Sequence, residues 1–162
     1  MISEAQYNEQ LPRLLSRMAK LSAIKSIQQS TTSFSSKDLI KGTSSPSNVN
    51  TPGHIQFMIR YNNNYALPIL YFKYFKPQYI IQDDMEIETS TSINKLEEIQ
   101  SFLQIPSEFP ISLGQCEDET WWFIHPCNTS DFLQNSEEQD YLNNWFSVYG
   151  GILFNVKVDE FY

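Results

Sequence analysis

The sequence predicts a single α+β domain, an antiparallel sheet of about four strands flanked by helices. Three observations support this prediction. Apolar residues have helical spacing near the N-terminus, aromatic and branched residues alternate in the middle of the chain, and a second helical pattern follows residue 136. The chain has 162 residues, 41% of them hydrophobic, which is enough for one core. We therefore expect residues 1–162 to form one domain.

Apolar residues near the N-terminus recur at spacings of three and four, the pattern of one buried helix face. The residues in this pattern are Leu11, Leu14, Leu15, Met18, Leu21 and Ile24. Pro12 stands near the start of the pattern, and a proline is tolerated in the first turn of a helix. We expect a helix that begins at Glu4 or Leu11 and ends near Gln28.

A loop and a hairpin are predicted next. Residues 30–53 are rich in Ser, Thr, Asn, Pro and Gly, which indicates a mobile loop. Residues 54–61 alternate in polarity, Asn residues at 62–64 suit a turn, and residues 65–75 form a second aromatic and branched run. These segments predict a β-hairpin, in which Pro68 indicates an edge position or a bulge.

The second half of the chain contains further short elements. We expect a third strand over residues 79–88 and a short helix over residues 94–103, where apolar residues have helical spacing. Residues 105–115 appear irregular in pattern. Residues 120–124 are aromatic and favour a strand, which Pro126 should end because proline has no N–H to donate.

The last predicted element is a helix that ends near Tyr149. Ser136 and Gln139 have the spacing of a capping box, and a strong apolar pattern follows them. The Gly150–Gly151 pair is expected to stop or bend this helix.

Charge and composition exclude several classes of function. The net charge is −8, divided as +4 over residues 1–60 and −12 over residues 61–162. The acidic part would repel a phosphate backbone, so we expect no nucleic acid partner. The acidic residues favour solubility, and a basic protein partner is the alternative. No glycine-rich phosphate loop is present, and we expect no cofactor.

The two cysteines and the apolar pattern indicate a compartment. A disulfide-stabilised secreted domain of this size usually has more than two cysteines. The first residues lack a basic start followed by an apolar run, and no apolar stretch reaches the roughly 20 residues of a membrane span. We expect a cytoplasmic protein with reduced thiols and no transmembrane segment.

Cys127 is the strongest candidate for a reactive residue. It follows the predicted strand at 120–124, where a thiol can be exposed, and its polar neighbours can tune the acidity of the thiol. His125 lies two residues before it. The alternative is a buried structural cysteine, the common state of a free cysteine. Cys116 has acidic neighbours, which disfavour a thiolate.

Two other kinds of site fit these residues less well. A cysteine hydrolase would need His125 or His54 as a base, which the pattern allows but does not indicate. A zinc site would need both of these histidines together with Cys116 and Cys127, and the chain has no closely spaced cysteine pair. We therefore expect no metal site.

The segment around Cys127 resembles one known family. His125-Pro126-Cys127 is followed by Asn128-Thr129, an aromatic strand precedes it, and Tyr141-Leu142 with Trp145 lie on the next helix. Residues 121–149 with these features resemble the autophagy-related protein 10 family, the conjugating enzymes of ubiquitin-like autophagy modification. The related autophagy-related protein 3 family also carries His-Pro-Cys but typically follows it with a basic residue and His.

The resemblance implies a fold, a reaction and partners. The fold would be a reduced ubiquitin-conjugating-enzyme fold. Cys127 would receive the autophagy-related protein 12 modifier as a thioester from the activating enzyme, autophagy-related protein 7, and a lysine of autophagy-related protein 5 would then attack this thioester. The resemblance also implies cytoplasmic localisation with recruitment to the pre-autophagosomal membrane.

The resemblance also assigns supporting residues. Ordinary ubiquitin-conjugating enzymes use an asparagine upstream of the cysteine to support the oxyanion, and this chain has no such residue. The family pattern implies that His125 and a hairpin tyrosine replace it, with Tyr65 as the match and Tyr61 as its rival. A non-catalytic interaction domain in which Cys127 is packed, or a cysteine hydrolase that uses Cys127, are the alternative functions.

Overall fold

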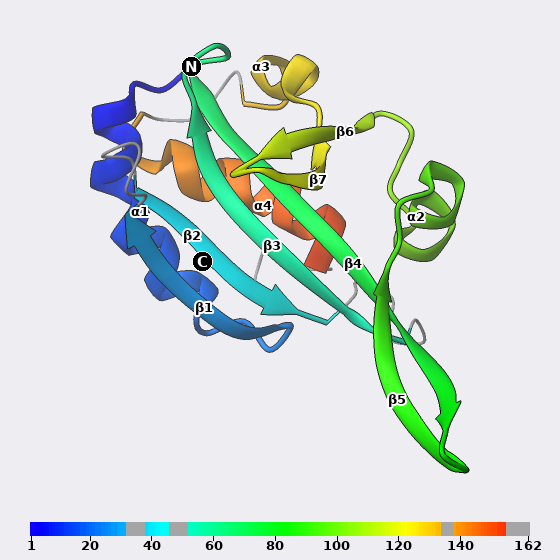
Figure 1. Cartoon of the computed structure of the whole chain (residues 1–162). Coiled ribbons are helices and arrows are strands. Elements are labelled where there is room, and N and C mark those ends of the chain that lie inside the picture. Colours follow the sequence, from blue (N-terminus) through cyan, green and yellow to red (C-terminus); the bar gives the residue numbers. More distant parts are fainter. Residues whose placement is uncertain (32–37, 46–51, 134–137, 155–162) are drawn as a thin grey trace.

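The computed structural model describes residues 1–31, 38–45, 52–133 and 138–154 (Figure 1). Its helices and strands are α1 Glu4–Met18, β1 Ile24–Thr31, β2 Asp38–Ser44, β3 His54–Asn62, β4 Leu67–Gln82, β5 Met85–Ser92, α2 Leu96–Leu103, β6 Ile111–Cys116, β7 Glu119–Ile124, α3 Thr129–Phe132 and α4 Tyr141–Phe154, with 3₁₀ turns at Pro126–Asn128 and Glu138–Asp140. Within the described residues one antiparallel sheet has the order β1-β2-β3-β4-β7-β6, and β5 pairs with the outer half of β4. The α+β class is confirmed, with seven strands in this part of the chain where about four were expected.

The core lies between one face of the sheet and two helices. Figure 1 shows α1 and α4 on the same face of the sheet. Both helices bury large side chains there: Tyr7, Leu11, Leu14 and Met18 from α1, and Trp145, Phe146, Tyr149 and Leu153 from α4. Burying each large apolar side chain contributes about 1.5–3 kcal/mol, so this layer dominates the stability of the fold.

Helix α1 is shorter than the sequence pattern predicts. It begins with a capping box between Ser3 and Gln6 and ends at Met18, so the prediction that it continues to Gln28 is wrong. The following residues form β1, because pairing with β2 overrides the helical spacing of their apolar residues. Pro12 lies inside α1 on its exposed side, well beyond the first turn.

The predicted loop at residues 30–53 is wrong in part. Residues 38–44 form β2, a central strand that pairs with β1 on one side and β3 on the other. Its polar residues have weak strand propensity, and the two neighbouring strands supply the hydrogen bonds that favour this conformation. The remaining parts of the predicted loop, residues 32–37 and 46–51, lie outside the described residues.

The predicted central hairpin is confirmed as β3 and β4. The two strands pair antiparallel from His54 with Phe75 to Asn62 with Leu67. On its other side β4 pairs with β7 only at Tyr71 and Phe72. Pro68 lies beyond that short pairing, so the missing N–H of proline falls where β4 has one unpaired side. This agrees with the predicted edge position.

Strand β4 continues past the body of the domain and forms a long arm with β5 (Figure 1). The single strand predicted at residues 79–88 is therefore wrong, because that segment includes the end of β4, a turn and the start of β5. The turn residues Asp83 and Asp84 have positive φ angles of 52° and 61°, which short polar side chains tolerate. The helix predicted at residues 94–103 is confirmed as α2.

A second hairpin, β6 and β7, precedes the Cys127 segment. The strand predicted at residues 120–124 is confirmed as β7, whereas the irregular structure predicted for residues 105–115 is wrong from residue 111 onward. The two strands are joined by Glu117 and Asp118, with φ angles of 53° and 63°. This pair is a two-residue hairpin turn.

Helix α4 runs further than predicted. It begins after the 3₁₀ turn, and it continues through Gly150 to Phe154. A Cβ atom at Gly150 would lie 2.7 Å from a ring atom of Phe146, so the glycine makes room for that ring inside the helix. Of the predicted capping box, Ser136 lies outside the described residues.

Candidate active site

Cys127 is exposed in a short turn directly after β7. Strand β7 ends at Ile124, as the proline rule predicts, and Pro126 occupies the first position of the 3₁₀ turn, where no N–H is required. Helix α3 begins at Thr129. The thiol is therefore held within a 3₁₀ turn, between the end of β7 and the start of α3, where a large substrate can approach it.

His125 is held by two backbone hydrogen bonds. The N–H of Cys127 donates to His125 Nδ1 at 3.2 Å, and the N–H of His125 donates to the carbonyl of Pro110 at 2.8 Å. Since Nδ1 is an acceptor, the proton of the neutral imidazole lies on Nε2. His125 can therefore donate a hydrogen bond from Nε2, while neither nitrogen of this neutral ring is free to accept the proton of the thiol.

The structure brings Tyr65 to His125. The two rings meet edge to face, with centroids 5.8 Å apart and an interplanar angle of 75°. The Tyr65 side chain is 42% exposed. The rival Tyr61 is 7% exposed, and its hydroxyl donates to the carbonyl of Ile2 at 2.9 Å. Of the two tyrosines weighed from the sequence, Tyr65 is the one beside the cysteine turn.

A buried layer beneath Cys127 was not recognised from the sequence. The hydroxyls of Thr129 and Tyr149 are hydrogen-bonded to each other, and both residues are buried. Burial raises the pKa of Tyr149 above its usual value. The hydrogen bond with Thr129 lowers this pKa, and the negative charge of a Cys127 thiolate raises it further. Tyr149 was expected only as part of an apolar helix face, so its proximity to Cys127 follows from how α4 packs.

The segment before β6 also supports the cysteine turn. The side-chain amide of Asn128 donates to the carbonyl of Glu108 at 3.0 Å. Phe109 stacks on Phe132 of α3 with ring centroids 4.8 Å apart and meets Tyr149 edge to face. Polar and aromatic contacts from residues 108–110 thus fix the turn, and no sequence pattern indicated them.

The remaining candidate residues lie apart from this site. Cys116 is buried on the outer face of the sheet, where its sulfur accepts a hydrogen bond from Arg60 Nη1 at 3.5 Å. His54 stacks on Phe75 at the far end of β3, about 26 Å along the strand from Asn62 at 3.3 Å per residue. The described residues contain no group of three or more histidine, cysteine or carboxylate side chains that could hold a metal ion.

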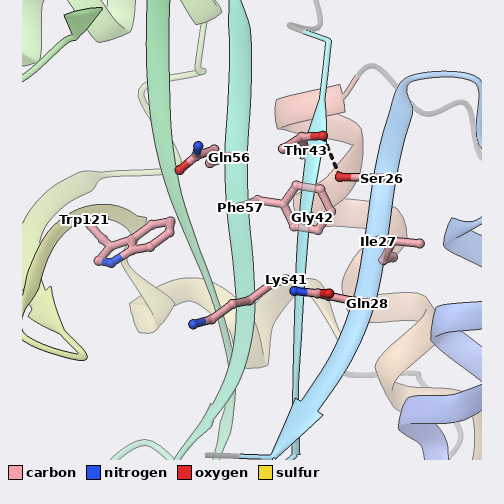
Figure 2. Close-up of a pocket in the computed structure, with 9 residues that line it drawn as sticks. All are labelled: Ser26, Ile27, Gln28, Lys41, Gly42, Thr43, Gln56, Phe57 and Trp121. Carbon is pink, nitrogen blue, oxygen red and sulfur yellow. Dashed lines mark hydrogen bonds between the residues drawn. The ribbon is translucent and has the colours of Figure 1, made fainter.

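A pocket of about 280 Å³ lies elsewhere, on the outer face of β1, β2 and β3. Figure 2 shows Trp121 at one side of this pocket and the hydrogen-bonded hydroxyls of Ser26 and Thr43 at the other, 2.8 Å apart. None of the nine residues that line it is a cysteine or a histidine. This pocket is therefore separate from the thiol chemistry at Cys127.

The sheet with helices on one of its faces, and the exposed cysteine beyond a strand end, match the fold of a known autophagic E2 structure. The fold is similar to the crystal structure of the autophagic E2 Atg10, with a TM-score of 0.71, 20% sequence identity, and coverage of 93% of this chain and 95% of that one. The chain belongs to the family described as autophagocytosis associated protein, active-site domain, whose model matches residues 2–160.

Curated relatives agree with this assignment. The chain is 28% identical over 110 residues to the ubiquitin-like-conjugating enzyme ATG10 of Candida glabrata, which covers 62% of this chain and 66% of the relative. It is 27% identical over 99 residues to the protein of the same name from Saccharomyces cerevisiae, which covers 59% of this chain and 58% of the relative. The matched region is thus under two thirds of each relative's length. The resemblance to the autophagy-related protein 10 family is confirmed.

None of the helices in the described part of the chain has the length and hydrophobicity that a membrane crossing requires.

Proposed function

We propose that residues 1–162 form one ubiquitin-like-conjugating domain of autophagy in which Cys127 carries the modifier as a thioester. The observation that supports this most directly is the exposure of the Cys127 thiol at a strand end, while Cys116 is buried. Following the family resemblance, the modifier is autophagy-related protein 12, the activating enzyme is autophagy-related protein 7 and the acceptor is autophagy-related protein 5. We place the protein in the cytoplasm, with recruitment to the pre-autophagosomal membrane.

The proposed reaction has two acyl transfers. The Cys127 thiolate attacks the thioester that joins the modifier to the activating enzyme, and the thiolate of that enzyme leaves. The neutral amine of an acceptor lysine then attacks the Cys127 thioester and the Cys127 thiolate leaves. After the C–N bond has formed, the nitrogen releases its extra proton to water, which leaves the isopeptide bond. Each step passes through a tetrahedral oxyanion, which hydrogen-bond donors stabilise.

His125 and Tyr65 are the proposed donors for this oxyanion. Nε2 of His125 carries a proton because Nδ1 accepts the N–H of Cys127. The Tyr65 ring, which carries the second donor hydroxyl, contacts the His125 ring edge to face. Losing one oxyanion donor typically costs about 3 kcal/mol, or more than a hundredfold in rate. We expect Tyr65→Phe to slow transfer to the acceptor by about that factor. Tyr79→Phe, which removes an exposed hydroxyl on the β4–β5 arm, is the matched control.

The alternative functions are less well supported by the same geometry. A cysteine hydrolase needs an imidazole nitrogen that accepts the thiol proton, whereas the His125 nitrogen that accepts is already bonded to a backbone N–H. His54 lies at the far end of β3. An interaction domain with a packed cysteine would bury Cys127, which is exposed.

The test of this function is a thioester assay. The protein is incubated with the activating enzyme, the modifier and ATP and is then separated on a non-reducing gel. We expect a thiol-sensitive adduct that is lost in Cys127→Ala, kept in Cys116→Ala and converted to a thiol-resistant oxyester in Cys127→Ser. Absence of any adduct with the unmodified protein would refute the proposal, and rapid release of the modifier without an acceptor would favour the hydrolase.

A further inference from the structure

The side chain of Asn62 organises the turn that carries Tyr65. Its Oδ1 atom accepts hydrogen bonds from two backbone N–H groups, that of Asn64 at 2.9 Å and that of Tyr65 at 3.3 Å. This is the turn in which an asparagine side chain replaces a backbone carbonyl. Because one of its two bonds goes to the N–H of Tyr65 itself, Asn62 directly restrains the backbone from which the Tyr65 side chain extends.

The orientation of Asn62 is itself restrained. Its side chain also hydrogen-bonds Tyr71 of β4, a contact that lowers the pKa of Tyr71 against the larger raising effect of burial. Tyr71 lies beside Phe123 of β7, and Phe123 lies beside His125, with ring centroids 5.8 and 6.1 Å apart. The same side chain therefore connects the turn to the sheet that supports His125.

The end of the turn is held from a different part of the chain. The N–H of Ile2 donates to the carbonyl of Ala66 at 3.2 Å, and the carbonyl of Ile2 accepts the hydroxyl of Tyr61 at 2.9 Å. Ala66 has a φ angle of 52°, in the left-handed region. Ile2 thus fixes the Ala66 end of the turn, and the Asn62 oxygen restrains its backbone at Asn64 and Tyr65.

We propose that Asn62 is a positioning residue for acyl transfer, which holds the Tyr65 ring against His125 without itself contacting the thioester. Tyr65 is 42% exposed, so the surrounding core restrains its side chain little and the backbone position decides where its hydroxyl lies. A displacement of about 1 Å at a catalytic group can cost on the order of a hundredfold in rate. This inference rests on the proposed function.

The experiment measures a single discharge of the modifier from preloaded Cys127 to the acceptor. We expect Asn62→Ala to slow this step by about tenfold to a hundredfold, because the restraint on Tyr65 is lost. Asn62→Asp keeps an oxygen at the same place and should restore the rate to within a few-fold. Asn63→Ala changes an exposed neighbour in the same turn and should leave the rate unchanged.

A double-mutant cycle distinguishes positioning from a general structural effect. In the Tyr65→Ala background, Asn62→Ala should cause no further slowing, because the group that it positions is gone. Equal slowing in both backgrounds, or an Asn62→Ala rate equal to that of the unmodified protein, would overturn the inference. If Asn62→Ala does not fold, Asn62→Leu replaces it, since leucine is of similar size and has no side-chain oxygen for the turn; a rate equal to that of the unmodified protein would again refute the role.

The outcomes also separate this inference from the proposed function. If the unmodified protein forms no Cys127 adduct, the proposed function fails before Asn62 is tested. If it forms the adduct and discharges it, but the Asn62 variants discharge at the same rate, only the positioning role fails.

Discussion

The hydrogen bond between Thr129 and Tyr149 offers a sharp test of how the cysteine turn is fixed to the core. Thr129 is 1% exposed and Tyr149 is 2% exposed, and their hydroxyls bond to each other. Thr129 begins α3 two residues after Cys127, whereas Tyr149 lies in α4. The pair therefore joins the turn to the main helix layer.

The expected free-energy changes follow from which group loses its partner. Tyr149→Phe leaves the Thr129 hydroxyl buried without its partner, and Thr129→Val does the same to Tyr149. Each single change should cost about 1–3 kcal/mol of unfolding free energy, because an unsatisfied buried polar group loses its hydration without compensation. The double variant removes both polar groups and should cost less than either single variant, since replacing both partners with apolar groups is nearly neutral.

The assay is equilibrium unfolding of the four proteins in urea at pH 7, with melting temperature as a second measure. Each kcal/mol of unfolding free energy that is lost should lower the melting temperature by about 2–4 °C in a chain of this size. Tyr79→Phe, which alters an exposed hydroxyl on the β4–β5 arm, is the control and should stay within about 0.5 kcal/mol. Additive single effects, giving no coupling between Thr129 and Tyr149, would refute the reasoning.

Three further predictions concern the sheet and the helices. Gly42→Ala should destabilise the fold by about 1–3 kcal/mol in urea unfolding, because the new Cβ would lie 2.6 Å from a ring atom of Phe57. Burial raises the pKa of Tyr141 to about 12. The neutral Tyr141 side chain therefore contributes to the free energy of unfolding below pH 10, and this contribution is lost as the pH rises to 12. Tyr141→Phe should therefore reduce the loss of stability measured across that window. The hydrogen bond from Lys73 lowers the pKa of Glu119 below 4.5. The ionised Glu119 side chain therefore contributes to the free energy of unfolding above pH 4.5, and this contribution is lost on acidification. In Lys73→Met, NMR titration should show the pKa of Glu119 return toward 4.5.

The position of Cys127 could be predicted from the sequence because the rules that fix it are local. An aromatic β-prone run followed by Pro126 predicts a strand end, and β7 ends at Ile124. The hairpin of β3 and β4 was predictable for the same reason, since alternation and an asparagine turn are contained within one segment. Local patterns thus located both sides of the candidate site, the cysteine turn and the tyrosine turn.

The strands that sequence reasoning missed have a weak strand signal of their own. Strands β1, β2 and β6 are rich in serine, glutamine, glycine or lysine, and their conformation depends on pairing, of β1 and β3 with β2 and of β7 with β6. The acidic pair Glu117–Asp118 suggested only an effect on the Cys116 thiol, although it is the turn that joins β6 to β7. A turn without glycine or asparagine gives a weaker hairpin signal than the usual two-residue turns.

The choice between Tyr61 and Tyr65 shows the same limit within the site. Both tyrosines belong to one hairpin, and the pattern alone left them as rivals. Tyr61 lies on the buried side because the first residues of the chain reach it, with its hydroxyl bonded to Ile2 and its ring 5.6 Å from that of Tyr7. A contact between residues about 60 positions apart has no trace in the local pattern.

Under the proposed function, the hydrogen bonding of His125 accounts for the persistence of a Cys127 thioester until an acceptor arrives. With Nδ1 accepting the N–H of Cys127, the neutral ring presents only a donor at Nε2 and cannot remove a proton from water. Water is then a weak nucleophile at this site, because general-base assistance typically contributes about 10²–10⁴-fold. A neutral lysine amine attacks without such a base and loses its proton only after the bond has formed. A site that offers donors but no base at His125 therefore favours transfer to an amine over hydrolysis, which is the selectivity that the proposed carrier role of Cys127 requires.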